Sequence, residues 1–530
     1  MDISKSLTLR SKLTSRREPI AFAFCLIAGL VGSFRFGYFA SWDGPAHAAS
    51  ARGMWQYEGA VAQLFRRDWF PSPNLIAHLY ESALLPILGP ALADRVVAAT
   101  CVVAVACGVR YLARSVATDT GALMSYAGLP LAFGWFVHAG QYSFLLGVGS
   151  ASAYLGWRLR NPASDGWSRH PAVTALALVW LYFCHIIPLA VVLIAHAVTS
   201  IPAVRQRQWR RLFVTWAPAL PALALVAAYL SRSTGGGAGR RDFEDLIADA
   251  ATMREVLVAY STRNELLALA PMIALIALIV IALLWRHRDV RSVPAASITA
   301  VVALMLAALY WVLPTNVAGG GFLTARLLLL AIVLSIATAS VLPRRFLRIV
   351  PIIAVASLLG SVALRQNEYS GFSDDLEELA EARTFLTDDD VVLGLIMCDE
   401  RESGCASAQA STTHPLSQFT GLLMAHTGAA DLTLYEAYFN YFPLQFRAET
   451  SPIDRLYFDA GESSTLPAID VAGYEQATGI EIDLIVIWGW DKVADDTSLV
   501  VLNRLRAALA TGYRLVLQSE RGHVTVFERI

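Results

Sequence analysis

Charged side chains are scarce in this chain of 530 residues: 16% of them are charged and 56% are hydrophobic. A soluble globular domain carries about 25% charged residues. Apolar runs such as residues 270–285 and 296–313 approach the roughly 20 residues that a helix needs to cross the hydrocarbon core of a bilayer. The mean hydropathy of +0.50 agrees with this pattern. The composition therefore excludes an ordinary soluble domain and predicts a polytopic helical membrane protein.

The sequence also lacks an excess of charge of either sign. Its formal net charge is −1, so the bulk charge predicts no nucleic-acid partner. No glycine-rich phosphate loop follows any expected strand, and we therefore expect no bound nucleotide. No internal repeat is detectable, which disfavours a transporter built from inverted repeats.

Cysteines number only six, and their spacing matches no common metal-binding pattern. Four of them lie within apolar runs, where a thiol serves as a small packing residue. The other two, Cys398 and Cys405, flank the polar sequence DERESG. If this part of the chain is extracytoplasmic, these two residues can form a disulfide.

Clusters of Lys and Arg predict the orientation in the membrane, because such clusters collect on the cytoplasmic side. The basic N-terminus and the long run after it lack a small-residue cleavage site, so we expect a retained first helix rather than a signal peptide. With every basic cluster taken as cytoplasmic, about eleven spans result and residues 365–530 lie outside. The expected spans are 19–40, 91–113, 121–138, 141–157, 171–185, 187–203, 212–230, 266–285, 295–313, 322–342 and 349–364.

Two outer segments are expected to be long. The first, residues 41–90, carries two helices that lie along the membrane surface, 45–58 and 74–88. Asn74, His78, Glu81 and Ser82 form one polar stripe on the second of these, which favours an interfacial helix over a span. The second outer segment, 231–265, is expected to be flexible at first and then to form an amphipathic helix. Arg240 and Arg241 within it are expected to bind lipid headgroups or nothing.

The chain changes character after residue 364, where acidic and mixed sequence replaces the apolar runs. Residues 373–386 and 497–512 predict helices, 390–398 and 482–490 predict buried strands, and 513–530 predict a hairpin that turns at Arg521-Gly522. Helices that alternate with buried strands indicate a small α/β domain. We therefore expect a membrane domain over residues 1–364 and a soluble, extracytoplasmic domain over 365–530.

Ionisable groups at membrane depth are costly and are by default hypotheses of function. Several of them, from distant parts of the chain, fall at the outer ends of the predicted spans. Asp43 in the sequence SWDGPAH is also a natural cap for a helix beginning at Pro45, but capping explains neither His47, one turn later, nor the charges beyond it. The candidate catalytic residues are Asp43 and His47, and the candidate substrate-binding residues are Arg52, Glu58, His78, His138, Gln141, His185 and Arg326.

This set of groups suits the transfer of a sugar from a lipid phosphate. A carboxylate such as Asp43 takes the proton of an acceptor hydroxyl as the new bond forms. An arginine such as Arg326 matches the oxygens of a departing phosphate with its planar fork. Because the donor already carries its leaving group, the absence of a nucleotide loop is consistent with this chemistry.

The stretch WDGPAHAASARG resembles the D-G-P-x-H form of the first outer loop in bacterial members of the GT-C superfamily of integral-membrane glycosyltransferases. The long first outer loop, the odd number of spans and the outer C-terminal domain are similar too. The resemblance implies an inverting transferase of the bacterial inner membrane, with a periplasmic C-terminal domain. It implies a polyprenyl-phosphate sugar as donor and a glycan, lipid or protein as acceptor, with Asp43 as base or as organiser of acceptor and metal. Many members carry an acidic pair where this chain has Asp43-Gly44, so either His47 takes the second role or no divalent metal ion is needed.

Two other functions fit parts of the sequence. In a transporter or lipid flippase the outer charges would line a passage, but ionisable residues near mid-membrane are scarce here. In a non-catalytic assembly protein, residues 365–530 would be the working part. The aromatic-rich stretch 414–447 would then stack on sugars or, as aromatic residues do more often, pack in a core.

Overall fold

A computed structural model of the chain describes residues 3–161, 170–232, 239, 241–317, 320–397, 412–453, 455–457, 466–494, 496 and 499–530, with the backbone alone for 3–16. The expected disulfide between Cys398 and Cys405 and the placement of Arg240 lie outside these residues. The chain divides into two compact units. Unit 1 comprises residues 1–35, 99–137 and 142–366, and unit 2 comprises 36–98, 138–141 and 367–530.

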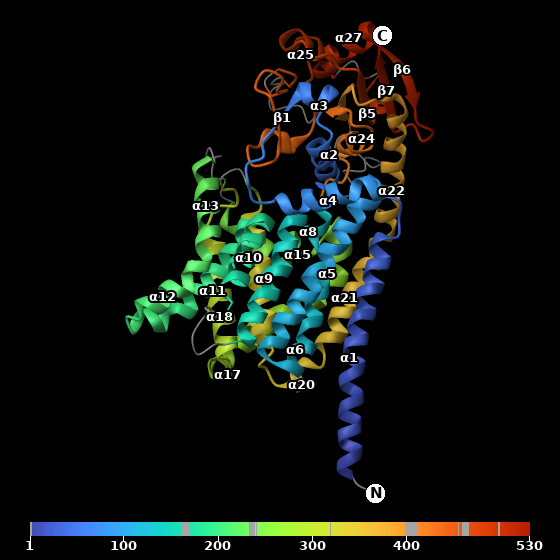
Figure 1. The fold of residues 1–530 in the computed structure, drawn as a ribbon. Coiled ribbons are helices and arrows are strands. Elements are labelled where there is room, and N and C mark those ends of the chain that lie inside the picture. Colours follow the sequence, from blue (N-terminus) through green and yellow to red (C-terminus); the bar gives the residue numbers. More distant parts are fainter. Residues whose placement is uncertain are drawn as a thin grey trace. The chain divides into compact units, whose positions relative to one another are not determined.

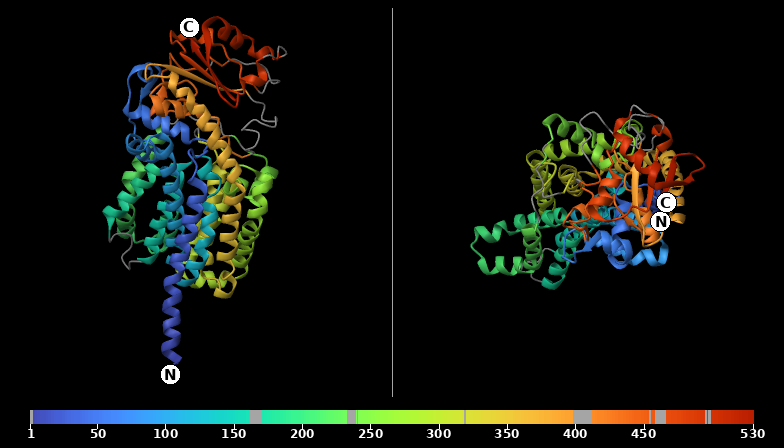
Figure 2. Two further views of the ribbon diagram at one scale, coloured as in Figure 1. Left: turned by 90° about the vertical axis from the view of Figure 1, so that its right-hand side faces the viewer. Right: turned by 90° about the horizontal axis from the view of Figure 1, so that it is seen from above.

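Unit 1 is built from helices that run alongside one another (Figures 1 and 2). They are α1 (Ile3–Phe34), most of α5 (Pro90–Val116), α6 (Thr118–Met124), η1 (Ser125–Ala127), α7 (Gly128–Ala132), α8 (Trp135–His138), α9 (Tyr142–Arg160), α10 (Pro171–Cys184), α11 (Ile186–Arg205), α12 (Trp209–Trp216), η3 (Ala217–Ala219), α13 (Leu220–Arg232), α14 (Phe243–Thr252), α15 (Arg254–Leu257), α16 (Thr262–Trp285), α17 (His287–Ser292), α18 (Pro294–Val312), α19 (Leu323–Ala339), α20 (Arg344–Leu347) and α21 (Val350–Leu364).

Eight helical stretches among the described residues are long and apolar enough to cross a membrane. They are 17–34, 90–116, 118–138, 186–205, 209–232, 262–285, 294–312 and 344–364. The other three expected spans correspond to α9, α10 and α19, of which α10 and α19 are shorter apolar helices. The expected multi-pass helical membrane fold is confirmed, whereas the number of eleven spans stays a prediction.

A buried ion pair ties together several segments of unit 1. Arg365 is 1% exposed, and its guanidinium donates to the Glu265 carboxylate at 2.5 and 2.7 Å. The same guanidinium donates to the backbone carbonyls of Phe133 and Leu257, at 2.7 and 2.9 Å. Glu265 in turn accepts from the backbone N–H of Ala259 and two following residues. This network therefore fixes the end of α21 against α16 and two connecting segments.

The second outer segment differs from the expectation in two ways. The expected amphipathic helix is split into α14 and α15 at Met253, whose φ is +51°. Arg241, expected to bind lipid headgroups or nothing, instead forms ion pairs with Asp249 and Glu255. That expectation was wrong because the two carboxylates lie eight and fourteen residues further along the chain, on helices that fold back toward the arginine.

Unit 2 contains the first long loop and the C-terminal part of the chain. From the loop come α2 (Gly44–Trp55), α3 (Gly59–Leu64), β1 (Phe65–Arg67) and α4 (Leu75–Leu88). The C-terminal part provides α22 (Gln366–Ala380), η4 (Glu381–Phe385), β2 (Val391–Ile396), α24 (Phe419–Thr427), β3 (Ala430–Asp431), η5 (Tyr435–Tyr438), β4 (Leu444–Phe446), α25 (Val471–Thr478), β5 (Leu484–Trp488), α26 (Trp490–Val493), η6 (Val500–Leu502), α27 (Asn503–Gly512), β6 (Tyr513–Gln518) and β7 (Val524–Arg529).

Five strands of unit 2 form a sheet in the order β3-β2-β5-β7-β6. The strand β2 is parallel to β3 and β5, while β7 is antiparallel to β5 and β6. The expected small C-terminal α/β region, with its terminal hairpin, is therefore confirmed. The hairpin turns through Gly522, whose φ of +77° favours glycine.

The first loop and the C-terminal part share one hydrophobic core. In Figure 1, α2 and α3 (blue) lie among the orange and red elements of the same unit. The strand β1 pairs antiparallel with β4, and loop residues such as Leu64 and Phe65 pack in a cluster with Leu393 and Ile485 of the sheet. Residues 36–98 and 138–141, expected within the membrane domain, belong to unit 2 together with 367–530. The boundary between a membrane domain and a soluble domain at residue 364 stays a prediction.

Candidate active site

Asp43 lies at the start of α2 and its side chain does not cap that helix. Its Oδ2 atom accepts a hydrogen bond from Nε2 of Gln141 at 2.8 Å. The hydroxyl of Tyr435 also hydrogen-bonds the Asp43 carboxylate. Burial, followed by the Asp43 charge, raises the pKa of Tyr435 well above its usual value, so this hydroxyl keeps its proton and donates. Two donors from distant parts of the chain thus orient the carboxylate.

Residues 138–141, with the sequence HAGQ, wrap closely around Asp43. The Trp42 N–H donates to the carbonyl of His138 at 2.8 Å. Gly140 has a φ of +74°, and a Cβ atom at this position would lie 2.8 Å from the backbone nitrogen of Asp43. Only glycine meets both conditions without strain. The predicted pair of His138 and Gln141 is therefore brought to Asp43 by a tight turn.

His47, His78 and Glu436 form a buried cluster one helical turn beyond Asp43. The Nδ1 atom of His47 lies 2.6 Å from Oε1 of Glu436, and Nε2 of His78 lies 3.0 Å from its Oε2. The hydroxyl of Ser50 donates to the same carboxylate. Glu436 is fully buried, and the two histidines are 7% and 1% exposed. One carboxylate of the C-terminal part therefore binds both α2 and α4 of the first loop.

The second nitrogen of each imidazole shows where its proton lies. Nε2 of His47 is 2.8 Å from the carbonyl of Gly140, and Nδ1 of His78 is 3.2 Å from the carbonyl of Asn74. Because a carbonyl only accepts, both of these nitrogens carry hydrogen and donate. The nitrogens that face Glu436 are therefore protonated as well, or they offer lone pairs to a cation.

The charged forms of His47 and Glu436 stabilise each other. Burial by itself lowers the pKa of His47, but the Glu436 carboxylate more than offsets it and raises the pKa to about 10. Burial by itself raises the pKa of Glu436, but the imidazoles of His78 and His47 hold it well below its usual range. At neutral pH the carboxylate is thus ionised and His47 is positively charged.

Glu81 lies one turn after His78 on the buried face of α4. It is fully buried, and neither of its carboxylate oxygens has a hydrogen-bond partner among the described residues. Burial, and then the nearby Asp94 carboxylate, raise the pKa of Glu81 well above its usual value. Glu81 was noted from the polar stripe of α4, and the structure places it within the electrostatic reach of His47 and Glu436.

The remaining predicted residues of unit 2 lie in other surroundings. His138 is fully buried and hydrogen-bonds the Tyr369 hydroxyl at 2.9 Å. Arg52 is partly buried in α2, where burial lowers the pKa of its guanidinium and Asp388 opposes the shift. Glu58 is exposed at the N-terminus of α3. A substrate-binding role for these residues stays a prediction.

Two predicted residues belong to unit 1, where they share an aromatic neighbour. The guanidinium of Arg326 lies 5.5 Å from the centroid of the Phe144 ring, within range of a cation–π contact. The ring of His185 packs edge-on against the same phenyl ring at 5.2 Å, and its Nδ1 atom accepts from the N–H of Ile187 at the start of α11. Both side chains are at least nine-tenths buried.

No protein-family model and no curated protein matches this chain, but solved structures do. ArnT from Cupriavidus metallidurans in the apo state aligns over 98% of both chains with a TM-score of 0.52 and 11% identity. ArnT of the same organism bound to undecaprenyl phosphate aligns over 96% of this chain and 98% of that one, with a TM-score of 0.51 and 12% identity. The chain has the ArnT fold. An oligosaccharyltransferase from Archaeoglobus fulgidus, in complex with Zn and sulfate, aligns over 96% of this chain and 73% of that one, with a TM-score of 0.40 and 12% identity.

The shared fold agrees with the helical membrane architecture and small C-terminal α/β region expected from the sequence. Two residues of the site were nevertheless missed from the sequence, Tyr435 and Glu436. Both lie in the stretch TLYEAYFNYF, which was read as aromatic packing or sugar stacking. The signal available was an acidic residue inside an otherwise aromatic and apolar segment, since a buried carboxylate needs a partner.

Proposed function

We propose that this chain is an inverting membrane glycosyltransferase that moves a sugar from a polyprenyl-phosphate donor to a hydroxyl of a glycan, lipid or protein. The observation that carries the proposal is Asp43, a carboxylate oriented by Gln141 and Tyr435 beside a buried cluster of charged groups. The ArnT fold supports it, and so does the undecaprenyl phosphate bound in one ArnT structure.

In the proposed reaction Asp43 acts as general base. As the acceptor oxygen attacks the anomeric carbon, its proton passes to the carboxylate of Asp43. The bond between the anomeric carbon and the phosphate oxygen breaks on the opposite side of the sugar, and the bonding electrons leave with the polyprenyl phosphate. Attack and departure on opposite faces invert the anomeric configuration. The donors Gln141 and Tyr435 hold the carboxylate in one orientation, which is what proximity catalysis requires.

Arg326 is the proposed binding group for the donor phosphate. Its guanidinium offers several N–H donors in one plane, a geometry that suits phosphate oxygens. Phe144 and His185 restrict the position of this side chain in the apolar environment of unit 1. Substitution of Arg326 by Lys keeps the charge but removes the planar fork, and we expect it to raise KM for the donor more than it lowers kcat.

His47, His78 and Glu436 are the proposed ligands of a divalent metal ion. Their ligand atoms all lie within 4.8 Å of one another. The N–H of the second nitrogen of each imidazole donates a hydrogen bond to a backbone carbonyl. This arrangement orients histidine ligands in metal sites. Two neutral imidazoles and the Glu436 carboxylate would leave such an ion with a net positive charge. When bound, it would supply a fixed positive charge near Asp43.

Metal content provides a test that does not depend on activity. We expect the purified chain to retain about one equivalent of a transition metal after dialysis, and Glu436→Gln and His78→Gln to lose it. The matched control is His426→Gln, which changes another partly buried histidine of unit 2. Wild-type protein that retains no metal after incubation with zinc would rule out the metal site, and the cluster would then be an ion-pair network alone.

The decisive test of the reaction is Asp43→Asn, which keeps the shape of the side chain and removes the base. We expect it to abolish transfer from a polyprenyl-phosphate sugar while expression, membrane insertion and melting temperature stay at wild-type values. Asp68→Asn on the same loop is the matched control, because Asp68 accepts a local turn hydrogen bond from the N–H of Phe70. Transfer by Asp43→Asn at the wild-type rate would rule out Asp43 as base.

The proposed location is the bacterial inner membrane, with the C-terminal part in the periplasm. In a background without native cysteines, a cysteine at exposed Thr511 on α27 should react with a thiol reagent that cannot cross membranes. A cysteine at exposed Arg288, between two cytoplasmic helix ends in the predicted topology, should react only after permeabilisation. The opposite pattern would invert the topology and place the proposed site on the cytoplasmic face.

A further inference from the structure

Unit 1 contains a cavity of about 450 Å³ that none of the proposed site residues lines. It lies between α9, α11, α12 and α18, with Leu334 of α19 at its inner wall. The lining includes the C-terminal turns of α9 and α11 and the first turn of α18, so the cavity is at the end of the helices where basic clusters gather. By the distribution of Lys and Arg, this end is cytoplasmic.

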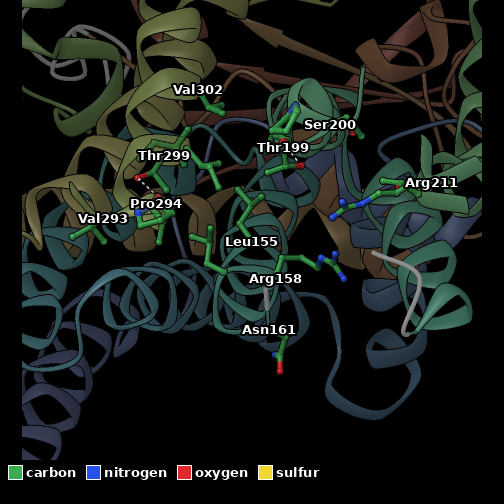
Figure 3. Close-up of a pocket in the computed structure, with 18 of the residues that line it drawn as sticks. Leu155, Arg158, Asn161, Thr199, Ser200, Arg211, Val293, Pro294, Thr299 and Val302 are labelled. Carbon is green, nitrogen blue, oxygen red and sulfur yellow. Dashed lines mark hydrogen bonds between the residues drawn. The ribbon is translucent and has the colours of Figure 1, made fainter. Parts of the chain in front are cut away.

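The cavity has apolar walls and a basic end. Leucine, isoleucine, valine, alanine and proline side chains form most of its surface, and the described residues that line it include no acidic side chain. Figure 3 shows the side chains of Arg158 and Arg211 reaching toward the same part of the cavity, with Asn161 nearby. The hydroxyls deeper inside already donate within the protein: Thr199 and Ser200 bond backbone carbonyls of α11. A ligand that fits must therefore be apolar along its length and anionic at one end.

The helix α12 indicates the depth of the cavity in the membrane. Trp209 and Phe213 on this helix are 67% and 71% exposed, and Arg210 and Arg211 are exposed beside them. Exposed aromatic side chains next to arginines are typical of a helix that lies at the level of the lipid headgroups. The N–H of the Trp216 indole donates to Ser200 of α11 at 3.2 Å and so holds α12 against the cavity.

We propose that this cavity binds one anionic phospholipid of the cytoplasmic leaflet, with its phosphate on Arg158 and Arg211 and an acyl chain along α11 and α18. Basic pockets between transmembrane helices on the cytoplasmic side recognise anionic headgroups in this way. The site is separate from the proposed donor phosphate site, because Arg326 and Leu334 are about 12 Å apart along α19 at 1.5 Å per residue. The proposal does not depend on the proposed reaction.

The test is lipid binding to the full chain, purified in detergent and titrated with phosphatidylglycerol or phosphatidylcholine while bound lipid is counted by native mass spectrometry. We expect one phosphatidylglycerol to bind more tightly than phosphatidylcholine. Each of Arg158→Gln and Arg211→Gln should weaken its binding about fivefold, since a basic residue near the surface contributes about 1 kcal/mol toward an anionic lipid. Arg288→Gln, which removes the same charge from the same membrane face outside the cavity, should leave binding unchanged.

A second variant separates the cavity from its charges. Ala203→Trp fills the space beside the acyl chain, keeps both arginines, and should lower the number of retained phosphatidylglycerol molecules by one. Equal binding of the two phospholipids would overturn the proposal, as would unaltered binding in all three cavity variants. Tighter binding of undecaprenyl phosphate than phosphatidylglycerol, lost in Arg158→Gln, would also overturn it and identify the cavity as a donor site instead.

Discussion

The replacement Glu436→Gln removes a buried negative charge of unit 2 and keeps the shape of the side chain. The wild-type carboxylate is fully buried and accepts from His47, His78 and Ser50. Removing one partner of a buried ion pair costs about 3–5 kcal/mol, because the other charge is left without compensation. For a unit of 150–250 residues, 1 kcal/mol shifts the melting temperature by about 2–4 °C. We therefore expect unit 2 of Glu436→Gln to melt about 10 °C below wild type.

The assay is thermal unfolding of the purified chain in detergent, followed by tryptophan fluorescence and checked at two scan rates. Glu449→Gln, the same change at an exposed position, controls for the loss of a surface charge. A double-mutant cycle with His78→Gln measures the coupling between the two groups, and we expect the second change to cost much less once the first is present. A melting temperature of Glu436→Gln within about 1 °C of wild type would refute the reasoning.

Three further predictions concern other buried contacts. Burial raises the pKa of Asp431 to about 6 from an ordinary 3.8. Because the folded state then holds this proton more tightly than the unfolded state, the free energy of unfolding falls as pH rises from 4 through 6. In denaturant titrations, Asp431→Asn should be up to about 3 kcal/mol more stable than wild type at pH 8 and equal to it at pH 4. Gly421→Val should lower the melting temperature, because a Cβ atom there lies 2.5 Å from the carbonyl of Pro45, while Gly371→Val in an open position should change it little. Arg365→Lys should unfold at least about 3 kcal/mol more easily, since one ammonium cannot reach the glutamate and both carbonyls at once, and calorimetry that shows no loss would contradict this.

The elements that the sequence could predict are those with a local pattern. Apolar runs located the helices of unit 1, and the polar stripe through His78 and Glu81 located the helix α4. The terminal hairpin followed from alternating residues around Gly522. In each case the information lies within twenty or so consecutive residues, because periodicity and turn chemistry are local properties.

What could not be predicted depends on long-range pairing. The strand β1 is three residues long, and the sequence Phe-Arg-Arg gives no sign that it pairs with Leu444–Phe446. One partner of Asp43 and one partner of His47, Tyr435 and Glu436, lie nearly four hundred positions away in an aromatic stretch that gives no sign of these contacts. The split of α14 from α15 follows from one residue, Met253, in a left-handed backbone conformation. The pattern of apolar residues around it is that of a continuous helix and does not reveal this break.

The shared core of the first loop and the C-terminal part determines when the first loop can fold during synthesis. His47 leaves the ribosome 389 residues before Glu436, the residue that binds it. Until the C-terminal part has been made, α2 and α4 have no sheet to pack against and Asp43 lacks one of its two donors. A product truncated before Glu436 would insert its helices into the membrane without completing this core, so the folding of the first loop depends on residues made much later.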